Sequence, residues 1–119
     1  MAVEDYSSEE YQPSGLVKVF QLPGTAGVAQ GFKAPSWADH CLLRVYTDNP
    51  TPPSTPTGDD AWYSHDVSKD GSNIGDSLYI AANDAIELVK NQKPGCMEFA
   101  VASATADGFV QMFFTAEDR

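Results

Sequence analysis

Short runs of apolar residues with strand-like alternation recur along this chain, and each run ends at residues that favour turns. In one run Cys41, Leu43 and Val45 share a face, because the side chains of a strand alternate between its two sides. Seven such runs are expected to be strands, at 15–22, 41–47, 61–67, 78–82, 85–90, 96–103 and 109–116. Short strands at this spacing indicate an all-β fold, either a sandwich or a jelly-roll-like barrel.

The segment from residue 77 to residue 90 allows a second interpretation. Its apolar residues also follow the three- and four-residue spacing of an amphipathic helix, and Asp76 or Ser77 would serve as its N-cap. We favour two strands joined by a hairpin turn at Asn83-Asp84, because the neighbouring segments are also β. The alternative is an α+β fold with one helix at 77–90.

Turn residues organise the rest of the chain. Asp107-Gly108 predicts a tight turn that would join the last two strands as a hairpin. Four of the eight prolines lie within the stretch 49–60, where they exclude a central strand and indicate an exposed loop. The Gly/Ala-rich stretch that starts at Gly24 and runs through Pro35-Ser36 is expected to be a flexible loop.

A length of 119 residues suits one domain of ordinary size. We expect that domain at 15–119, with the proline-rich loop at 49–60 within it. Residues 1–14 contain four acidic residues and no Lys or Arg, so they are expected to be an acidic, flexible N-terminal arm. The expected core draws on Leu16, Val19, Phe20, Leu43, Val45, Leu78, Ile80, Leu88, Phe99, Val101, Val110, Met112 and Phe114.

The charge of the chain excludes two classes of partner. Seventeen acidic residues against seven Lys and Arg give a net charge of −10. Affinity for nucleic acid comes mostly from Lys and Arg that displace counterions, and anionic membranes attract the same basic residues. The chain also shows neither the basic start of a signal peptide nor an apolar run long enough to cross a membrane. We therefore expect no nucleic acid and no membrane as a partner.

One loop resembles the beginning of a calcium-binding loop. Asp66 and Asp70 stand at the first and fifth positions of an EF-hand-like pattern, and Gly71 stands at the sixth. The twelfth position is Ser77, so the bidentate glutamate is missing and no helix precedes the loop. Asp66 and Asp70 are thus weak calcium candidates, and no metal is assigned.

Nothing in the sequence forms a motif for catalysis. No nucleophile elbow and no phosphate-binding loop is present, so we expect neither an enzyme nor a cofactor. Cys41 and Cys96 are expected to be buried thiols, because apolar residues follow each of them. A disulfide between them is the alternative if the protein works in an oxidising environment.

Aromatic residues near strand edges are the best candidates for contact with a ligand. Trp37, Trp62 and Tyr63 lie next to predicted loops, where an aromatic ring can stack on a sugar or fill a pocket of a partner. Asp59, Asp60, His65 and Asp66 lie close to Trp62 and Tyr63 in the sequence. Trp62 and Tyr63 could therefore form a carbohydrate platform, and ordinary packing is the other interpretation.

The overall pattern resembles that of small structural proteins of tailed-phage virions, of the head decoration or cement type. The resemblance rests on the acidic start VEDYSSEEYQPSG, the Thr/Pro-rich loop TPPSTPTGDD, the short strands and the hairpin-like ATADGF. It implies a non-catalytic subunit of the virion that forms homo-oligomers, trimers above all. Its partner would be the major capsid protein or another virion protein, whose neighbouring subunits it would clamp.

The same resemblance implies that residues 1–14 reach over the capsid shell and become ordered on contact. The candidates for partner binding in this arm are Glu4, Asp5, Tyr6 and Tyr11. The runner-up is a carbohydrate-binding β-sandwich module that uses Trp62 and Tyr63.

Overall fold

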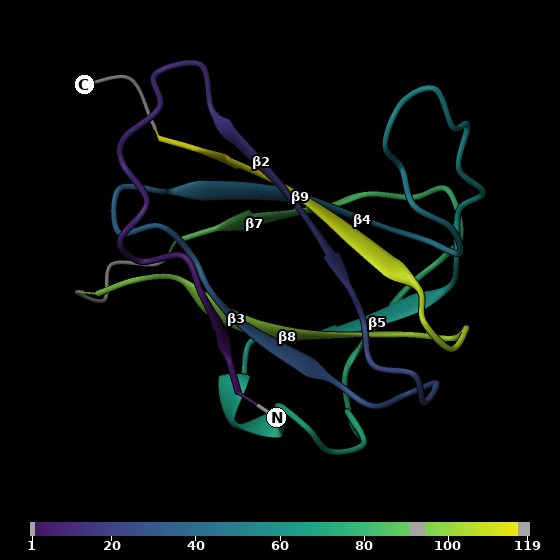
Figure 1. The fold of residues 1–119 in the computed structure, drawn as a ribbon. Helices are drawn as coiled ribbons and strands as arrows, with labels where there is room; N and C mark the ends of the chain where they lie inside the picture. The colour runs from purple at the N-terminus through teal and green to yellow at the C-terminus, as the bar shows by residue number, and fades with distance from the viewer. Residues whose placement is uncertain (1, 91–94, 117–119) are drawn as a thin grey trace.

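Two β-sheets pack face to face in this protein (Figure 1). The structure is a computed structural model, and it describes residues 2–90 and 95–116. The five-stranded sheet has the order β1 (Glu4–Asp5), β3 (Gln30–Lys33), β8 (Glu98–Ser103), β5 (Ala61–Ser64), β6 (Leu78–Ile80). The four-stranded sheet has the order β2 (Leu16–Gln21), β9 (Phe109–Thr115), β4 (His40–Tyr46), β7 (Ile86–Val89). The expected all-β sandwich is confirmed, and the sheets do not close into a barrel.

Side chains from both sheets fill the space between them. Phe32 and Phe99 from the five-stranded sheet and Leu43, Met112 and Phe114 from the four-stranded sheet are fully buried there. Strand β9 alternates strictly between buried and half-buried residues, as expected for a strand with one face in the core. Beyond the strands, the regular structure within residues 2–90 and 95–116 consists of one short 3-10 helix, η1 (Val67–Lys69). No helix among the described residues is long and apolar enough to span a membrane.

The alternative of a helix at 77–90 is wrong, because β6 and β7 occupy this segment. The expected hairpin between them is also wrong, since β6 pairs with β5 and β7 pairs with β4 in the other sheet. Asn83 does adopt the turn conformation, with φ of 71°. The chain crosses from one sheet to the other here. The Asp60 carboxylate accepts a hydrogen bond of 2.9 Å from the Ala82 N–H, and this bond fixes the start of the crossing.

The expected hairpin around Asp107-Gly108 is wrong for a similar reason. Strand β8 pairs with β3 and β5, whereas β9 pairs with β2 and β4. Asp107 has the positive φ of a turn residue, 59°, but the strands on either side belong to different sheets. The buried Asp59 carboxylate accepts hydrogen bonds from the backbone N–H and the hydroxyl of Thr105, which fixes the connection at the end of the sandwich.

Strand β3 lies within the stretch that the sequence predicts as a flexible loop, so that expectation is wrong. Its residues are almost entirely buried because it runs between β1 and β8 and lies under η1. A Cβ atom at Gly31 would lie 3.0 Å from side-chain atoms of Val67 and Asp70. Glycine is thus used here for close packing rather than for flexibility.

The segment expected as a free arm is docked on the domain in this structure. Glu4 and Asp5 form β1, which pairs with β3 in parallel register. Tyr6 follows in the core, where its ring stacks on Phe32 and meets Phe114 edge to face. The structure therefore differs from an arm that becomes ordered only on a partner.

The proline-rich loop at 49–60 connects β4 to β5, and residues 51–55 are all exposed. Its base is closed by a backbone hydrogen bond of 2.9 Å from Thr47 to Thr57. The Asp48 carboxylate accepts a second bond, also 2.9 Å, from the Thr57 N–H. Figure 1 shows the loop as the large excursion in teal that stands away from both sheets.

Candidate functional site

The segment 66–77 covers the outer face of β3 and β8 in the five-stranded sheet, and we call this part of the sheet the covered face. Ala100 and Ala102 of β8 point outward here, and Ile74 and Trp62 pack on them in a small apolar cluster. Ile74 and both alanines are buried. Figure 1 shows η1 on this side of the molecule, opposite the four-stranded sheet.

Several hydrogen bonds fasten this cover to the sheet. The Asp70 carboxylate accepts a bond of 2.7 Å from the backbone N–H of Gly31 in β3. Backbone bonds join Ile74 to Gly27 at 2.9 Å and Ala29 to Ser72 at 2.8 Å. Within the cover, the Lys69 ammonium group donates to the carbonyl oxygens of Ile74 and Asp76. The cover is therefore built by specific contacts and does not merely lie over the sheet.

The outer face of the four-stranded sheet is exposed, and we call it the bare face. Its outward residues are Val17, Val19, Gln21, His40, Leu42, Arg44, Tyr46, Glu87, Val89, Phe109, Gln111, Phe113 and Thr115. Val17 on the edge strand β2 is 54% exposed, and Leu42 on the inner strand β4 is 40% exposed. Contiguous exposed apolar surface of this kind marks interaction sites in soluble proteins.

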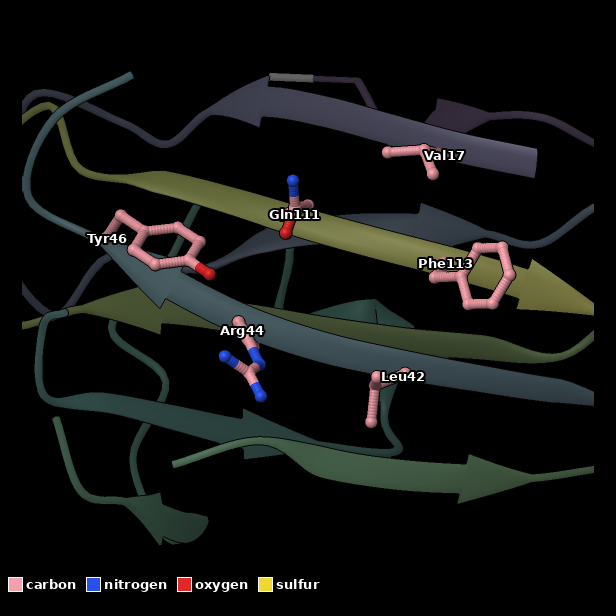
Figure 2. Close-up of a pocket in the computed structure, with 6 residues that line it drawn as sticks. All are labelled: Val17, Leu42, Arg44, Tyr46, Gln111 and Phe113. Carbon is pink, nitrogen blue, oxygen red and sulfur yellow. The ribbon is translucent and has the colours of Figure 1, made fainter. Parts of the chain in front are cut away.

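An apolar row crosses the bare face from strand to strand. Phe113 lies opposite Val17 on one side and opposite Leu42 on the other, and Glu87 continues the row beyond Leu42. Two shallow hollows of about 310 and 330 Å³ share Leu42 and Phe113 in their lining. Figure 2 shows the first hollow, with Arg44 beside Leu42 and the apolar side chains on neighbouring strands.

The bare face is almost neutral, in contrast to the rest of the molecule. Among its outward residues Arg44 is the one arginine or lysine and Glu87 is the one acid. The chain as a whole has 17 acids, so 17 − 1 = 16 of them lie elsewhere. Neither Arg44 nor Glu87 forms an ion pair with another described residue. An apolar strip with an unpaired charge of each sign is suited to contact with another protein chain.

The Trp62–Tyr63 platform expected from the sequence does not form. The two residues are neighbours on β5, so their side chains point to opposite sides of the sheet. Tyr63 packs on Phe99 toward the core, with 6.1 Å between ring centroids. Trp62 lies on the outer side, next to Tyr79 of β6 at 6.2 Å. The pair on this surface is therefore Trp62 and Tyr79, and the sequence analysis missed Tyr79.

A carboxylate orients Tyr79. The Tyr79 hydroxyl donates a hydrogen bond of 2.7 Å to Asp60, although Tyr79 is 55% exposed. This bond lowers the pKa of Asp60 and raises the pKa of Tyr79, because it favours the ionised carboxylate and the protonated phenol. A small hollow of about 150 Å³ beside Trp62 is lined also by Asn73 and by Gly27, Ile74 and Gly75.

Tyr11 and Trp37, two other predicted contact residues, lie together. Their rings meet edge to face with centroids 5.4 Å apart. The Trp37 indole N–H donates a hydrogen bond of 3.0 Å to the carbonyl oxygen of Glu9, so it fastens the N-terminal segment. Lys18 adds an ion pair with Glu9 at 3.3 Å. These contacts hold the segment along the domain, although Tyr11 itself stays 57% exposed.

The remaining arm candidates have structural partners as well. The Asp5 carboxylate accepts a hydrogen bond of 2.8 Å from the Ser7 N–H, and bonding to Ser7 lowers the pKa of Asp5. Burial raises the pKa of the Tyr6 hydroxyl. The Lys18 ammonium group lies over the Tyr6 ring, 5.3 Å from the ring centroid. Glu4 contributes its backbone to β1, in register with Phe32.

The two calcium candidates serve different local purposes in the structure. Asp66 caps η1 and accepts hydrogen bonds from the Ser68 N–H and hydroxyl, whereas Asp70 bonds to Gly31. The bonds from Ser68 also lower the pKa of Asp66. In the described part of the chain, no group of three or more His, Cys, Asp or Glu side chains is placed to hold a metal ion.

Both cysteines are free thiols in the structure, which therefore differs from the alternative of a disulfide between Cys41 and Cys96. Cys41 is fully buried in the core, and burial raises its pKa to about 12. A thiol with such a pKa stays protonated at neutral pH and is a poor nucleophile. Cys96 is half-buried, so the expectation of a buried thiol holds fully only for Cys41.

The residues of the bare face were not among the sequence-based candidates, although a signal for them exists. In the run 15–22 apolar residues fall on both faces of the strand, and Leu42 interrupts the alternation of Cys41, Leu43 and Val45. A strand with one solvated face normally alternates apolar with polar residues. Apolar residues at these outward positions therefore predict either a second buried face or a contact surface.

The comparisons with known proteins identify no relative. Models of protein families, characterised proteins and solved structures give no significant match to this chain.

Proposed function

We propose that this protein is a non-catalytic structural subunit that works by binding other protein chains through the bare face. The single observation that carries the proposal is the apolar row of Val17, Phe113 and Leu42 on the bare face, in which Val17 and Leu42 are exposed and Phe113 is half-buried. Leaving apolar surface in water is unfavourable by about 25 cal/mol per Å², so its retention in a small domain favours a contact role.

Within that class, the resemblance described above favours a decoration or cement protein of a phage head, which would be located in the virion. A decoration protein must bind a preformed lattice of capsid subunits without chemistry. The bare face offers such binding, and the exposed proline-rich loop offers a second contact at another end of the molecule. The major capsid protein, or another virion protein, is the partner that this function requires.

Where a major capsid gene adjoins the gene of this chain, the test is co-sedimentation with capsids assembled from its product. We expect the native protein to pellet with capsids and Leu42→Glu to remain in the supernatant. Leu78→Glu is the matched control, because Leu78 is an equally apolar residue that is 56% exposed on β6 of the other sheet. Equal loss of binding in both variants, or no binding by the native protein, would contradict the proposed function.

A second candidate function rests on the pair Trp62 and Tyr79. An aromatic ring fixed by a hydrogen bond binds a planar apolar ligand face with little loss of conformational entropy, and the apolar face of a sugar ring is such a surface. Asp60 and Asn73, next to these rings, would supply polar contacts to sugar hydroxyls. A carbohydrate-binding module is therefore the alternative, with Tyr79 in place of Tyr63.

Tryptophan fluorescence during titration with a panel of glycans tests this alternative. Quenching that is lost in Tyr79→Ala and retained in Tyr11→Ala would support it, since Tyr11 and Tyr79 are almost equally exposed. A fluorescence spectrum that no glycan changes would remove it and leave the structural function as the only proposal.

A further inference from the structure

We infer that the occupant of the bare face is a second copy of this chain, packed face to face across a two-fold axis. This inference rests on the proposed function, because it concerns the same surface: the second copy occupies the bare face in the free protein, and a capsid subunit would displace it on binding. The charge distribution disfavours a basic partner at this surface. A basic partner would be attracted to the surfaces that hold the other 16 acids rather than to this nearly neutral face.

Two copies of the chain repel each other over most of their surface, since each carries a net charge of −10. The bare face is where that repulsion is least, because Arg44 and Glu87 balance each other there. It is also where burial of Val17, Leu42 and Phe113 would stabilise the contact most. Charge and apolar area thus favour the same surface for self-association.

The positions of Arg44 and Glu87 suit a two-fold contact. Glu87 lies opposite Leu42 in the neighbouring strand, and Arg44 lies two residues further along β4 on the same face. They are therefore about 8 Å apart along the diagonal of the sheet. An in-plane two-fold axis between them places Arg44 of each copy opposite Glu87 of the other, which gives two reciprocal ion pairs.

The size of the face sets the strength of the contact. Four strands of about six residues cover roughly 20 by 20 Å, or about 400 Å² in projection. A stable interface buries about 800 Å² of accessible surface on each partner. The face is thus small for a stable interface, and we expect a reversible dimer rather than a permanent one. A face-to-face contact closes with two copies, so the assembly differs from the trimer that the phage resemblance implies.

Sedimentation equilibrium of the full chain, from about 5 µM to about 1 mM, is the first part of the test. We expect the mass to rise from 12.8 kDa toward twice that value. Leu42→Glu should weaken the dimer by about 100-fold or more, because the substitution occurs twice in a two-fold interface. Leu78→Glu should behave as the native chain. A native chain that stays monomeric, or forms a trimer, overturns the inference, and so do equal effects of the two variants.

The second part uses charge reversal, which does not depend on core packing. Arg44→Glu alone and Glu87→Lys alone each place like charges opposite each other in a homodimer, so each should associate at least 10-fold more weakly than the native chain. A one-to-one mixture of the two variants should recover association, because each reversed charge then meets its complement. Far-UV circular dichroism checks that every variant is folded. A mixture no stronger than its components overturns the reciprocal pairing.

Failure of this inference and failure of the proposed function give different results. A native chain that is monomeric at every concentration but pellets with capsids through Leu42 would overturn the second copy alone. A native chain that forms the two-fold dimer but pellets with no capsid would overturn the decoration function alone.

Discussion

The covered face and the bare face both present apolar residues outward from their sheets, yet they differ in what protects those residues from water. On the covered face Ala100 and Ala102 lie beneath Ile74 and Trp62, and a hydrogen bond from the Gly31 N–H to Asp70 helps to fix the cover. On the bare face larger residues, Val17 and Leu42 among them, remain exposed. Small outward residues beneath a packed segment indicate a structural role for that face, and large outward residues left exposed indicate a contact surface.

The largest expected effect is a difference between the two faces in how much a substitution lowers the free energy of unfolding. Ile74→Ala should lower the free energy of unfolding by about 3 kcal/mol, because it removes a buried side chain and leaves a cavity under the cover. Leu42→Ala should lower it by less than about 1 kcal/mol, because the side chain is already in contact with water. Urea denaturation of dilute protein measures both values. Equal losses would mean that the bare face is packed after all.

A smaller effect tests how the cover is fastened. Asp70→Ala should lower the free energy of unfolding by about 2 kcal/mol, because the Gly31 N–H in β3 loses its acceptor in a partly buried position. Asp76→Ala is the control, since Asp76 lies exposed in the same segment. Hydrogen exchange should show faster exchange of the Gly31 amide in Asp70→Ala only. Unchanged exchange there would show that the cover does not depend on this bond.

The smallest expected effect is on the stability of the protein at acidic pH. The pKa of Asp66 is lowered from its ordinary value of 3.8 by its bonds to Ser68, so the folded state favours the ionised carboxylate. This contribution to stability is fully present above the unfolded pKa and is lost as the pH falls through the lower pKa of the folded state. The unfolding midpoint should therefore fall more steeply between pH 5 and pH 2 in the native chain than in Asp66→Asn, which retains an acceptor but does not titrate. Parallel pH profiles for the two proteins would contradict the assignment of this cap.

Local pattern was enough to predict most of the strands. Alternation in the runs that became β4, β8 and β9 depends only on which residues share a face, and that is a property of the strand itself. Pairing could not be predicted in the same way. The turns at Asn83 and Asp107 exist, but contacts from distant carboxylates, Asp59 and Asp60, direct the chain into the other sheet.

The candidate surface was harder to predict than the fold. Val19 and Leu78 were both expected in the core, and both are exposed. An apolar residue in a strand has the same signature whether its face meets the other sheet or the solvent, so the sequence could not separate the two. Trp62 and Tyr63 show the converse, because adjacent aromatic residues look like one platform until the pleat of β5 places them on opposite sides.

The most direct test of the bare face as the contact surface is a dilution series of amide NMR spectra. As concentration rises, we expect shifts and broadening confined to 16–21, 40–46, 86–89 and 109–115, the four strands of that sheet. Amides of β5, β6 and the cover should stay unchanged over the same range. Changes centred on Trp62 and Tyr79, or no change at any concentration while the chain associates, would contradict the account.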